Sequence, residues 1–472
     1  MKKFLFVTMM TVVGLAASAD VVSDVRQLLD NKDYNGAVEL IQSELEVNPA
    51  SASDGRLAEL WGEALLAMGD AGTATEKFEL AKKKGFADAS LWLARLSMRR
   101  YDFTTAASHY DNYIKLKNKA KKEIDPKAQL ERGKIAKLQQ ALNRVENITV
   151  IDSLTVPKEE FFKAYKLHPS AGKLLSPEEM PVADAQQNAV TGFMNEGGDI
   201  ILWAQPDTLD NRRIVEAIKL TDGTWSETMY LPEVLNGGGD ADYPFMMPDG
   251  LTLYFANNGE ESLGGYDIFI ASKAVDGDFL APQNLGMPYN SPFDDYLLVI
   301  DEQTGVGWWA TDRKQIPDSL TLFVYLPNDV RKNLDSEDEE IDVASFARIA
   351  DIKATQDPEE DYSPYLEAIE ANAQREATPP ADFAFRLPDG TLLERYNQLR
   401  TEREREAMKK YLDSLKIYDN SLKALDGLRK DYHYRGSTAT LKMQIADLET
   451  SVLNQKKALK KKKNDLILLL AK

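Results

Sequence analysis

The chain contains 472 residues, a length that corresponds to about three domains of ordinary size. Its 57 Lys and Arg residues are outnumbered by 76 Asp and Glu residues, which gives a net charge of −19 at pH 7. We do not expect so acidic a chain to bind nucleic acid, because neutralising phosphates requires a basic face. Cysteine is absent, which excludes disulfides, thiolate zinc sites, iron–sulfur clusters, cysteine nucleophiles and lipid attachment at a lipobox cysteine.

The first residues have the pattern of a secretory signal peptide. Two lysines precede an apolar run over residues 4–17, and the small residues Ala17 and Ala19 stand just before Asp20. We therefore expect residues 1–19 to be removed by cleavage between Ala19 and Asp20. A membrane anchor is the disfavoured alternative, since a spanning helix needs about 20 apolar residues. The rest of the chain has no apolar run of spanning length, which predicts an exported protein without a membrane span, in the periplasm or at the outer membrane.

Residues 20–147 are rich in Ala, Leu, Lys and Glu and carry a repeated pattern of one small and one large residue. The small residue recurs at intervals of 37 and 32 positions, with a large one four positions later: Ala37 with Ile41, Ala74 with Phe78, and Ala106 with Tyr110. This pattern resembles the second helix of a tetratricopeptide repeat, whose period is about 34 residues. The resemblance implies a helical solenoid whose concave surface holds a peptide or a partner protein. A structural spacer is the alternative.

The composition changes near residue 148, where Gly, Pro, Asp and aromatic residues become frequent and apolar runs shorten. We expect short strands joined by turns over residues 148–330. Three stretches recur 53 or 54 positions later: 222–225 at 276–279, 254–256 at 308–310, and Asp242-Tyr243 at Asp295-Tyr296. A period of about 50 residues with several strands in each unit predicts the blades of a β-propeller.

The central copy of this repeat carries the most specific motif. Pro248-Asp249-Gly250 separates two apolar stretches, and Gly265-Tyr266-Asp267 begins a third. Tyr243 precedes the turn, and Tyr296 takes its place in the next copy. These residues resemble a TolB-like propeller repeat, in which a Pro-Asp-Gly turn joins two strands and a Gly-Tyr-Asp stretch begins the next one. At 54 residues per blade, the region 148–330 would hold about three blades, fewer than a closed propeller usually has, so we expect a small or incomplete propeller.

Two further segments could complete this β region. Residues 148–152 predict one strand, and residues 383–393 contain a second Pro-Asp-Gly hairpin that we expect to close the β region. Between them, residues 331–382 are predicted to be an acidic linker, because positions 333–382 hold fifteen acidic and three basic residues. Such blocks usually remain solvated. Binding of calcium or of a basic partner is the alternative, although the spacing of an EF-hand loop is missing.

Residues 394–472 contain two stretches whose apolar residues alternate at intervals of three and four. This spacing predicts two helices with coiled-coil stripes, and Gly436 marks the break between them. We expect an antiparallel helical hairpin that pairs within the chain or drives self-association. Lys456, Lys457 and Lys460–Lys463 form a basic cluster near the end. We interpret the cluster as a solvated helix end that faces acidic neighbours, in preference to a contact with anionic lipid or nucleic acid.

We expect no catalytic, cofactor-binding or metal-binding residues. The sequence has no Walker loop, no Gly-x-Ser-x-Gly and no His-Glu-x-x-His, and each of these motifs would carry a specific chemistry. The three histidines lie in different segments: His109, His168 and His433. Four carboxylates recur beside tyrosines and could supply the pair of a glycosidase: Asp240, Asp242, Asp294 and Asp295. Their recurrence favours a structural role, since an active site is normally built once and Asp beside a turn usually caps backbone N–H groups.

The combination of signal peptide, tetratricopeptide-like helices and TolB-like repeats is similar to the TPR–propeller components of outer-membrane secretion machinery. That resemblance implies a non-enzymatic scaffold or adaptor that binds other cell-envelope proteins through its helical and propeller surfaces. The OmpA-like domain that often accompanies such proteins has no counterpart here, and a helical hairpin takes its place. A propeller that binds or hydrolyses glycan is the second hypothesis, and a structural oligomer assembled through the C-terminal helices is the third.

Overall fold

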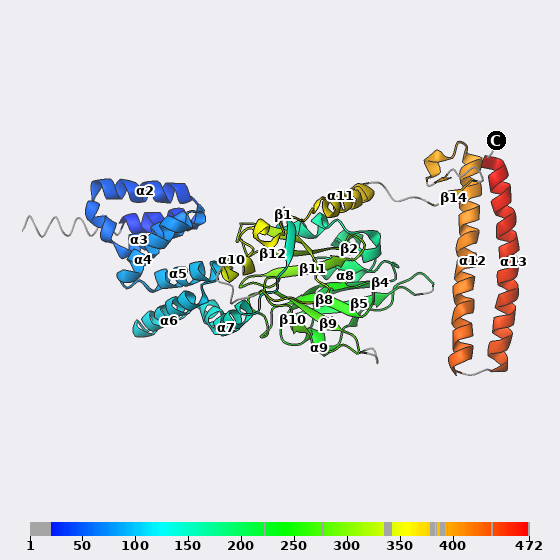
Figure 1. Ribbon diagram of the computed structural model, residues 1–472, viewed down its shortest axis with the longest axis horizontal. Helices are drawn as coiled ribbons and strands as arrows, with labels where there is room; N and C mark the ends of the chain where they lie inside the picture. Colours follow the sequence, from blue (N-terminus) through cyan, green and yellow to red (C-terminus); the bar gives the residue numbers. More distant parts are fainter. Residues whose placement is uncertain are drawn as a thin grey trace, which may run out of the picture. The chain divides into compact units, whose positions relative to one another are not determined.

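The computed structural model (Figure 1) describes residues 20–220, 222–274, 278–334, 342–377, 383, 385–387, 392–393, 395–435 and 438–470. The chain divides into two compact units, of which one comprises Met1–Lys219 and Trp225–Glu370, and the other Leu220–Thr224 and Ala371–Lys472. The predicted mixture of N-terminal helices, central β structure and C-terminal helices is confirmed. Residues 1–19, with the predicted cleavage residue Ala19, lie outside the described residues, and Asp20 begins the first described helix.

The first unit opens with a row of helices that follow one another along the chain. After helical residues 20–30 come α2 (Tyr34–Val47), α3 (Gly55–Ala67), α4 (Ala71–Lys83), α5 (Ala87–Arg99), α6 (Phe103–Lys119) and α7 (Pro126–Leu142). Five of these helices begin after an aspartate whose carboxylate accepts a hydrogen bond from a first-turn N–H: Asp33, Asp54, Asp70, Asp102 and Asp125. Each such cap stabilises its helix by about 1 kcal/mol. Local sequence therefore sets where these helices start.

The repeated small and large residues lie where these helices pack together. Ala37, Ala74 and Ala106 are fully buried, and so are Phe78 and Tyr110. The close approach is clearest at Gly62 of α3, where an added Cβ would lie 2.6 Å from the ring of Phe78. The small-then-large pattern thus marks the helix–helix contacts of this region.

Three antiparallel sheets follow in the same unit. The first sheet has the order β2-β3-β4-β5-β6 and the second β10-β9-β8-β7. The third sheet, β1-β13-β12-β11, combines the earliest strand of the region with the latest three. The strands of the first sheet are β2 (Lys173–Leu175), β3 (Gly192–Met194), β4 (Ile200–Pro206), β5 (Arg212–Ile218) and β6 (Met229–Tyr230). Those of the second are β7 (Ala241–Met246), β8 (Thr252–Asn257), β9 (Asp267–Ser272) and β10 (Gln283–Asn284). Those of the third are β1 (Thr149–Pro157), β11 (Asp295–Asp301), β12 (Val306–Thr311) and β13 (Ser319–Leu326).

The predicted strand at 148–152 is β1, which pairs with β13 from Thr149 opposite Leu326 to Pro157 opposite Ser319. The Pro248-Asp249-Gly250 turn joins β7 to β8, and Gly250 has the positive φ of +67° that such a turn requires. The Asp249 carboxylate accepts hydrogen bonds from the N–H groups of Leu251 and Thr252. The turn chemistry read from the sequence is therefore present in the structure.

The sequence repeat also appears as a repeated set of hydrogen bonds. The Asn236 side chain bonds both the N–H and the C=O of Ile214, and the Asn290 side chain, 54 positions later, bonds both groups of Ile268. We call each of these an asparagine clip. Each clip attaches the connection to the next sheet onto a strand of the preceding one, β5 or β9. The two copies are thus equivalent in bonding as well as in sequence.

The ladder register corrects one part of the predicted repeat. Asp242 lies opposite Ala256, and Tyr296 lies opposite Ala310, so Asp242 corresponds to Tyr296 and the spacing is 54 throughout. The predicted match of Asp242-Tyr243 with Asp295-Tyr296 is shifted by one residue. Both strands carry a bulge directly after this position, which keeps the two copies in the same register, so the recurrence of the letters Asp-Tyr joins positions that are not structurally equivalent.

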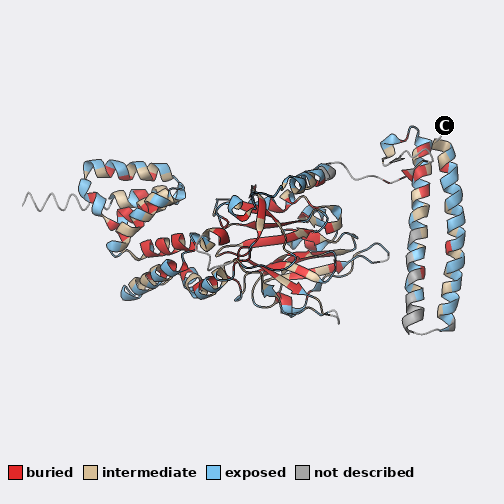
Figure 2. Ribbon diagram, in the orientation of Figure 1, coloured by how far each residue is buried: buried red, intermediate tan, exposed pale blue. Residues whose placement is uncertain are grey.

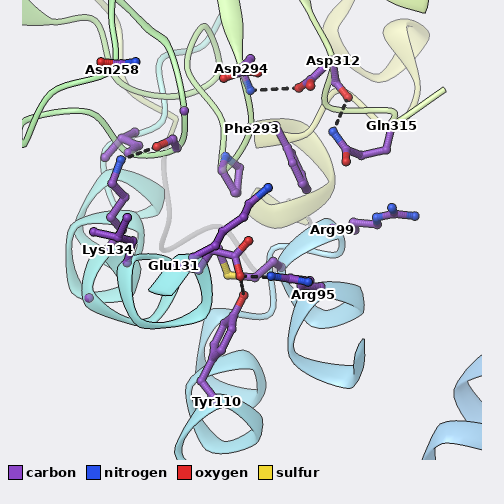
Figure 3. A pocket seen from close by; sticks show the side chains of 18 of the residues that line it. Arg95, Arg99, Tyr110, Glu131, Lys134, Asn258, Phe293, Asp294, Asp312 and Gln315 are labelled. Carbon is purple, nitrogen blue, oxygen red and sulfur yellow. Dashed lines mark hydrogen bonds and ion pairs between the residues drawn. The ribbon is translucent and has the colours of Figure 1, made fainter. Parts of the chain in front are cut away.

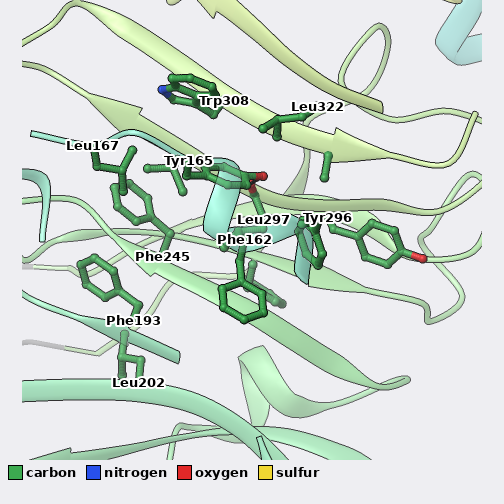
Figure 4. Close-up of a cluster of buried hydrophobic side chains, with 14 of the residues drawn as sticks. Phe162, Tyr165, Leu167, Phe193, Leu202, Phe245, Tyr296, Leu297, Trp308 and Leu322 are labelled. Carbon is green, nitrogen blue, oxygen red and sulfur yellow. Dashed lines mark hydrogen bonds between the residues drawn. The ribbon is translucent and has the colours of Figure 1, made fainter. Parts of the chain in front are cut away.

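A single large cluster of buried side chains joins the three sheets. It includes Phe193 and Leu202 of the first sheet, Phe245 of the second and Trp308 of the third (Figure 4). Residues 158–171 contribute Phe162 and Tyr165 to the same cluster, and the Tyr165 hydroxyl donates to the C=O of Leu297 over 2.7 Å. Figure 2 shows the strands of this region as mostly buried. The core of this region is therefore formed jointly by side chains from all three sheets.

The segment expected to be a solvated acidic linker is ordered over much of its length. Residues 342–377 contain α10 (Val343–Ala347), a 3₁₀ turn at Ile352–Thr355 and α11 (Ser363–Ala377). Phe346 is buried in one cluster with Tyr101 and Met287. The Thr355 hydroxyl accepts a hydrogen bond from the N–H of Val150 in β1. Apolar residues scattered among the carboxylates pack this segment against the rest of the first unit. The net charge of the segment gave no sign of these contacts. The dense acidic run at 335–341 lies outside the described residues.

The second unit contains the hairpin of long helices α12 (Glu402–Arg435) and α13 (Ala439–Leu470), which pack on each other as predicted. The late hairpin at 383–393 belongs to this unit. Its strands β14 (Phe385–Arg386) and β15 (Leu392–Leu393) pair with each other, and Phe385 packs against Tyr411 of α12 with ring centres 5.4 Å apart. We expected this hairpin to close the β region; instead its aromatic side chains cover the helices.

Candidate functional site

The first unit contains a groove of about 950 Å³ between helices and the loops of the sheets. One wall comes mainly from α5, α6 and α7, and the other from residues 258–265, 292–294 and 312–315. We call it the helix–sheet groove. Figure 3 shows Phe293 directed from the sheet wall toward the helices. A groove of this size is large enough for a small molecule or a few residues of an extended chain.

Most of the charged side chains on the helix wall are basic. Arg95 pairs with Glu131 and Asp125, each at 3.1 Å, and the Tyr110 hydroxyl donates to Glu131 over 3.0 Å. Arg99 also lines the groove, and it forms no ion pair with any carboxylate in the described part of the chain. Burial lowers the pKa of Arg99, but an arginine remains protonated in proteins. This wall therefore presents at least one cation that is free to pair with a ligand.

The two walls are tied together at one end. Lys134 of α7 donates to the hydroxyl of Ser262, at 2.7 Å, and to the C=O of Gly264. Lys137 donates to the C=O of Glu260 and pairs with Glu261 at 3.2 Å. Burial lowers the pKa of Lys134. These bonds hold the loop of residues 259–265 against α7.

The sheet wall carries two carboxylates that lie near each other. The N–H of Asp294 donates to Asp312 over 2.9 Å, while the Asp294 carboxylate accepts from the N–H of Tyr266 and the hydroxyl of Tyr296. Burial, together with the charge of Asp294, raises the pKa of Asp312 to about 6. An added Cβ at Gly265 would lie 1.8 Å from an Asp294 carboxylate oxygen, so a larger residue there would displace the Asp294 side chain. The groove thus has an acidic wall opposite a basic one.

Three tyrosines predicted as structural repeat positions, Tyr243, Tyr266 and Tyr296, come together in the structure. The rings of Tyr243 and Tyr296 are 5.1 Å apart, and that of Tyr266 lies 6.0–6.1 Å from both. Phe161 packs against Tyr243 and Tyr296. Phe161 was not singled out from the sequence, since it lies outside the repeat. These four aromatic rings form part of the core at the junction of the sheets.

Each of the four candidate carboxylates forms hydrogen bonds or an ion pair with other groups of the same chain. Asp295 is fully buried and pairs with Arg313 at 2.9 Å, and Asp242 is buried and pairs with Arg212. Asp240 accepts hydrogen bonds from the N–H of Arg212 and the side chain of Asn258. Asp294 is bonded to Tyr266 and Tyr296, as described above. Each carboxylate fixes local backbone or a buried arginine, which supports a structural role.

Asp267, from the Gly-Tyr-Asp motif, organises the loop of residues 259–265, which lines the groove. Its carboxylate accepts hydrogen bonds from the N–H groups of Leu263 and Gly264 and from the side chain of Asn284. It is fully buried, and that burial, together with the nearby Asp295, raises its pKa from 3.8 to about 7. The folded protein therefore holds a proton here over a pH range in which the unfolded chain has released it.

This shift predicts that stability falls as the pH rises from about 4 to 7, because the stabilising contribution of protonated Asp267 is lost through its folded-state pKa. Asp267→Asn imitates the protonated form, so we expect a weaker pH dependence of the free energy of unfolding over that range. Asp242, Asp295 and Asp312 also have raised pKa values, so part of the dependence should remain. Urea titrations at several pH values would measure it, with the exposed Asp329→Asn as control. An unchanged slope in Asp267→Asn would contradict the assignment.

Among the described residues, no cluster of three or more His, Asp or Glu side chains is placed to hold a metal ion. None of the described helices combines the length and the apolar character needed to cross a membrane. Comparison of the sequence with protein-family models and with curated proteins gives no match. The residues of the groove therefore have to carry any functional argument.

Sequence reasoning missed most of the groove. Arg99, Lys134 and Phe293 have no repeat partner and follow no known motif. Asp312 did have a detectable signal, because it stands 54 positions after Asn258, and both side chains accept a hydrogen bond from an N–H 18 positions earlier. The predicted residues Tyr110 and Gly265 do line the groove, although we selected them for their repeat positions alone.

Proposed function

We propose that the protein is an exported, non-enzymatic adaptor that holds a segment of another cell-envelope protein in the helix–sheet groove. The observation that carries this proposal is the groove itself, about 950 Å³ in volume, with one wall from the helices and the other from the sheet loops. We further propose that the helices are a tetratricopeptide-like solenoid and that the three sheets form a small TolB-like propeller. The 54-residue recurrence of the asparagine clips supports the second assignment.

The lining of the groove favours a peptide over a compact apolar ligand. Trp92, Leu130 and Phe293 supply apolar surface, and charges of both signs stand around them. A segment of polypeptide offers apolar side chains, charged side chains and backbone hydrogen-bonding groups together, which such a lining can match. The glycan-hydrolase hypothesis has less support, since its four candidate carboxylates are engaged in the bonds described above.

Site-specific photocrosslinking in cells tests the proposal. Leu130 lines the groove and is 67% exposed, whereas Leu209, 79% exposed, lies in the turn after β4 and does not line it. We expect a photoreactive amino acid at Leu130 to give a discrete adduct with another envelope protein, and the same group at Leu209 to give none. The adduct at Leu130 should weaken when Arg99→Glu is added.

Two results would contradict the proposal. Equal adducts at both positions would indicate contact that does not depend on the groove, and the lack of any adduct at Leu130 would leave the groove without a protein ligand. In the second case, binding and hydrolysis of purified envelope glycan become the next measurements.

A further inference from the structure

The second half of α13 presents an exposed face that is both basic and apolar. This feature lies in the second unit and does not depend on the helix–sheet groove. Six lysines occur within eight positions, with no acidic residue among them: Lys456, Lys457, Lys460, Lys461, Lys462 and Lys463. All six are exposed, in a chain whose net charge is −19.

We expected these lysines to face acidic neighbours, and one of them, Lys462, shares a hollow with Glu406 and Asp465. No ion pair joins any of the six to a carboxylate in the described part of the chain. Lys462 donates to the hydroxyl of Ser414, and Lys463 lies 6.0 Å from the centre of the Phe385 ring. Lys457, Lys460 and Lys461 extend into solvent. None of the six lysines is therefore held in a direct ion pair within the described hairpin.

Two leucines share the same face. At 100° per residue, Leu453, Lys457, Lys460, Lys461 and Leu468 fall within an arc of roughly 100°. Leu453 is 52% and Leu468 66% exposed. Val452 and Leu466, which are buried, lie on the other side of the helix. The outward face thus has lysines in its centre and an exposed leucine toward each end, about 22 Å apart along the axis.

We propose that this outward face of α13 binds the surface of a membrane that contains anionic lipids. Lysines attract lipid phosphates, while exposed leucines can enter the boundary between headgroups and acyl chains. A lipid surface satisfies the charges and the leucines at once, whereas free phosphate satisfies only the charges. The helix is too polar to span a bilayer, so it would lie along the membrane surface.

Flotation of the purified chain with lipid vesicles tests this proposal. The probes are vesicles of phosphatidylcholine alone and vesicles of equal parts phosphatidylcholine and phosphatidylglycerol. We expect binding only to the second kind, reduced by salt. The triple variant Lys457→Gln, Lys460→Gln, Lys461→Gln should bind about tenfold more weakly or worse. The double variant Leu453→Ser, Leu468→Ser should also bind more weakly, which separates lipid from free phosphate as the ligand.

The matched control removes three exposed lysines elsewhere, Lys119→Gln, Lys121→Gln and Lys122→Gln in and after α6, and should bind like the unaltered chain. Circular dichroism checks that each variant keeps its helices. Equal weakening in the control, or binding to vesicles that lack phosphatidylglycerol, would overturn the proposal. So would a sedimentation mass that falls in the leucine variant without vesicles present, because the face would then join two copies of the chain.

Discussion

Arg313→Met should lower the free energy of unfolding by about 3–5 kcal/mol, the cost of leaving a buried charge without its partner. The partner is Asp295, which is fully buried, and Arg313 itself is only 2% exposed at its side chain. The guanidinium also donates to the C=O of Tyr289 over 2.7 Å and to the hydroxyl of Thr311 over 3.0 Å. Methionine fills similar space but satisfies none of these acceptors. Denaturant titration followed by tryptophan fluorescence would report the loss, since Trp308 and Trp309 lie in the neighbouring β12.

Two comparisons make this result specific to burial. Arg132→Met removes a surface arginine that pairs with Asp111 at 2.7 Å, where both side chains are more than a third exposed, so we expect a loss below about 1 kcal/mol. Adding Asp295→Asn to Arg313→Met removes the unpaired charge and should restore part of the lost stability. If the buried and the surface arginine variants lost equal free energy of unfolding, the buried Asp295–Arg313 pair would not be the source of the stability that Arg313 provides.

Asn290→Leu should lower the free energy of unfolding by about 1–3 kcal/mol, because it leaves the buried N–H of Ile268 without a partner, whereas the C=O of Ile268 keeps its hydrogen bond from the N–H of Leu285. The equivalent Asn236→Leu breaks the same clip at Ile214 and should cost a similar amount. Asn118→Leu changes an exposed asparagine of α6 and should alter stability by less than about 0.5 kcal/mol. The same denaturant titration measures all three.

The pair of clip variants also tests the repeat. If the two asparagines have equivalent roles, their losses should agree within about 1 kcal/mol. A large loss of stability at Asn290 with almost none at Asn236 would mean that only one connection between sheets depends on its clip. The two 54-residue copies would then match in sequence but differ in how much their clips stabilise the fold.

Parts of the fold could be predicted because they depend on neighbours in the chain. Asp70 and Asp102 cap their helices through a carboxylate three positions from the bonded N–H, and Pro248-Asp249-Gly250 closes a turn with its own backbone. The small-then-large spacing of Ala74 and Phe78 marks a buried helix face. Period and turn chemistry of this kind are readable without any knowledge of distant residues.

The candidate site could not be predicted in the same way. Arg99 and Phe293 are 194 positions apart in the sequence, and they line one groove only because α5 and the loop before β11 are brought to it by packing. Neither residue belongs to a motif. The raised pKa of Asp312 likewise depends on its burial and on the nearby charge of Asp294, neither of which is visible in the order of residues.

The sequence by itself determined the helix starts, the Pro-Asp-Gly turn, the 54-residue period and the two stripes of the C-terminal hairpin, because each depends on residues within a few turns or one repeat. Tertiary structure decided the register that matches Asp242 with Tyr296, the docking of residues 342–370, and the place of the hairpin at 383–393. In each of these cases competing arrangements satisfy the same local preferences. The choice between them depends on which apolar side chains become buried together, as with Phe346 beside Tyr101 and Phe385 beside Tyr411.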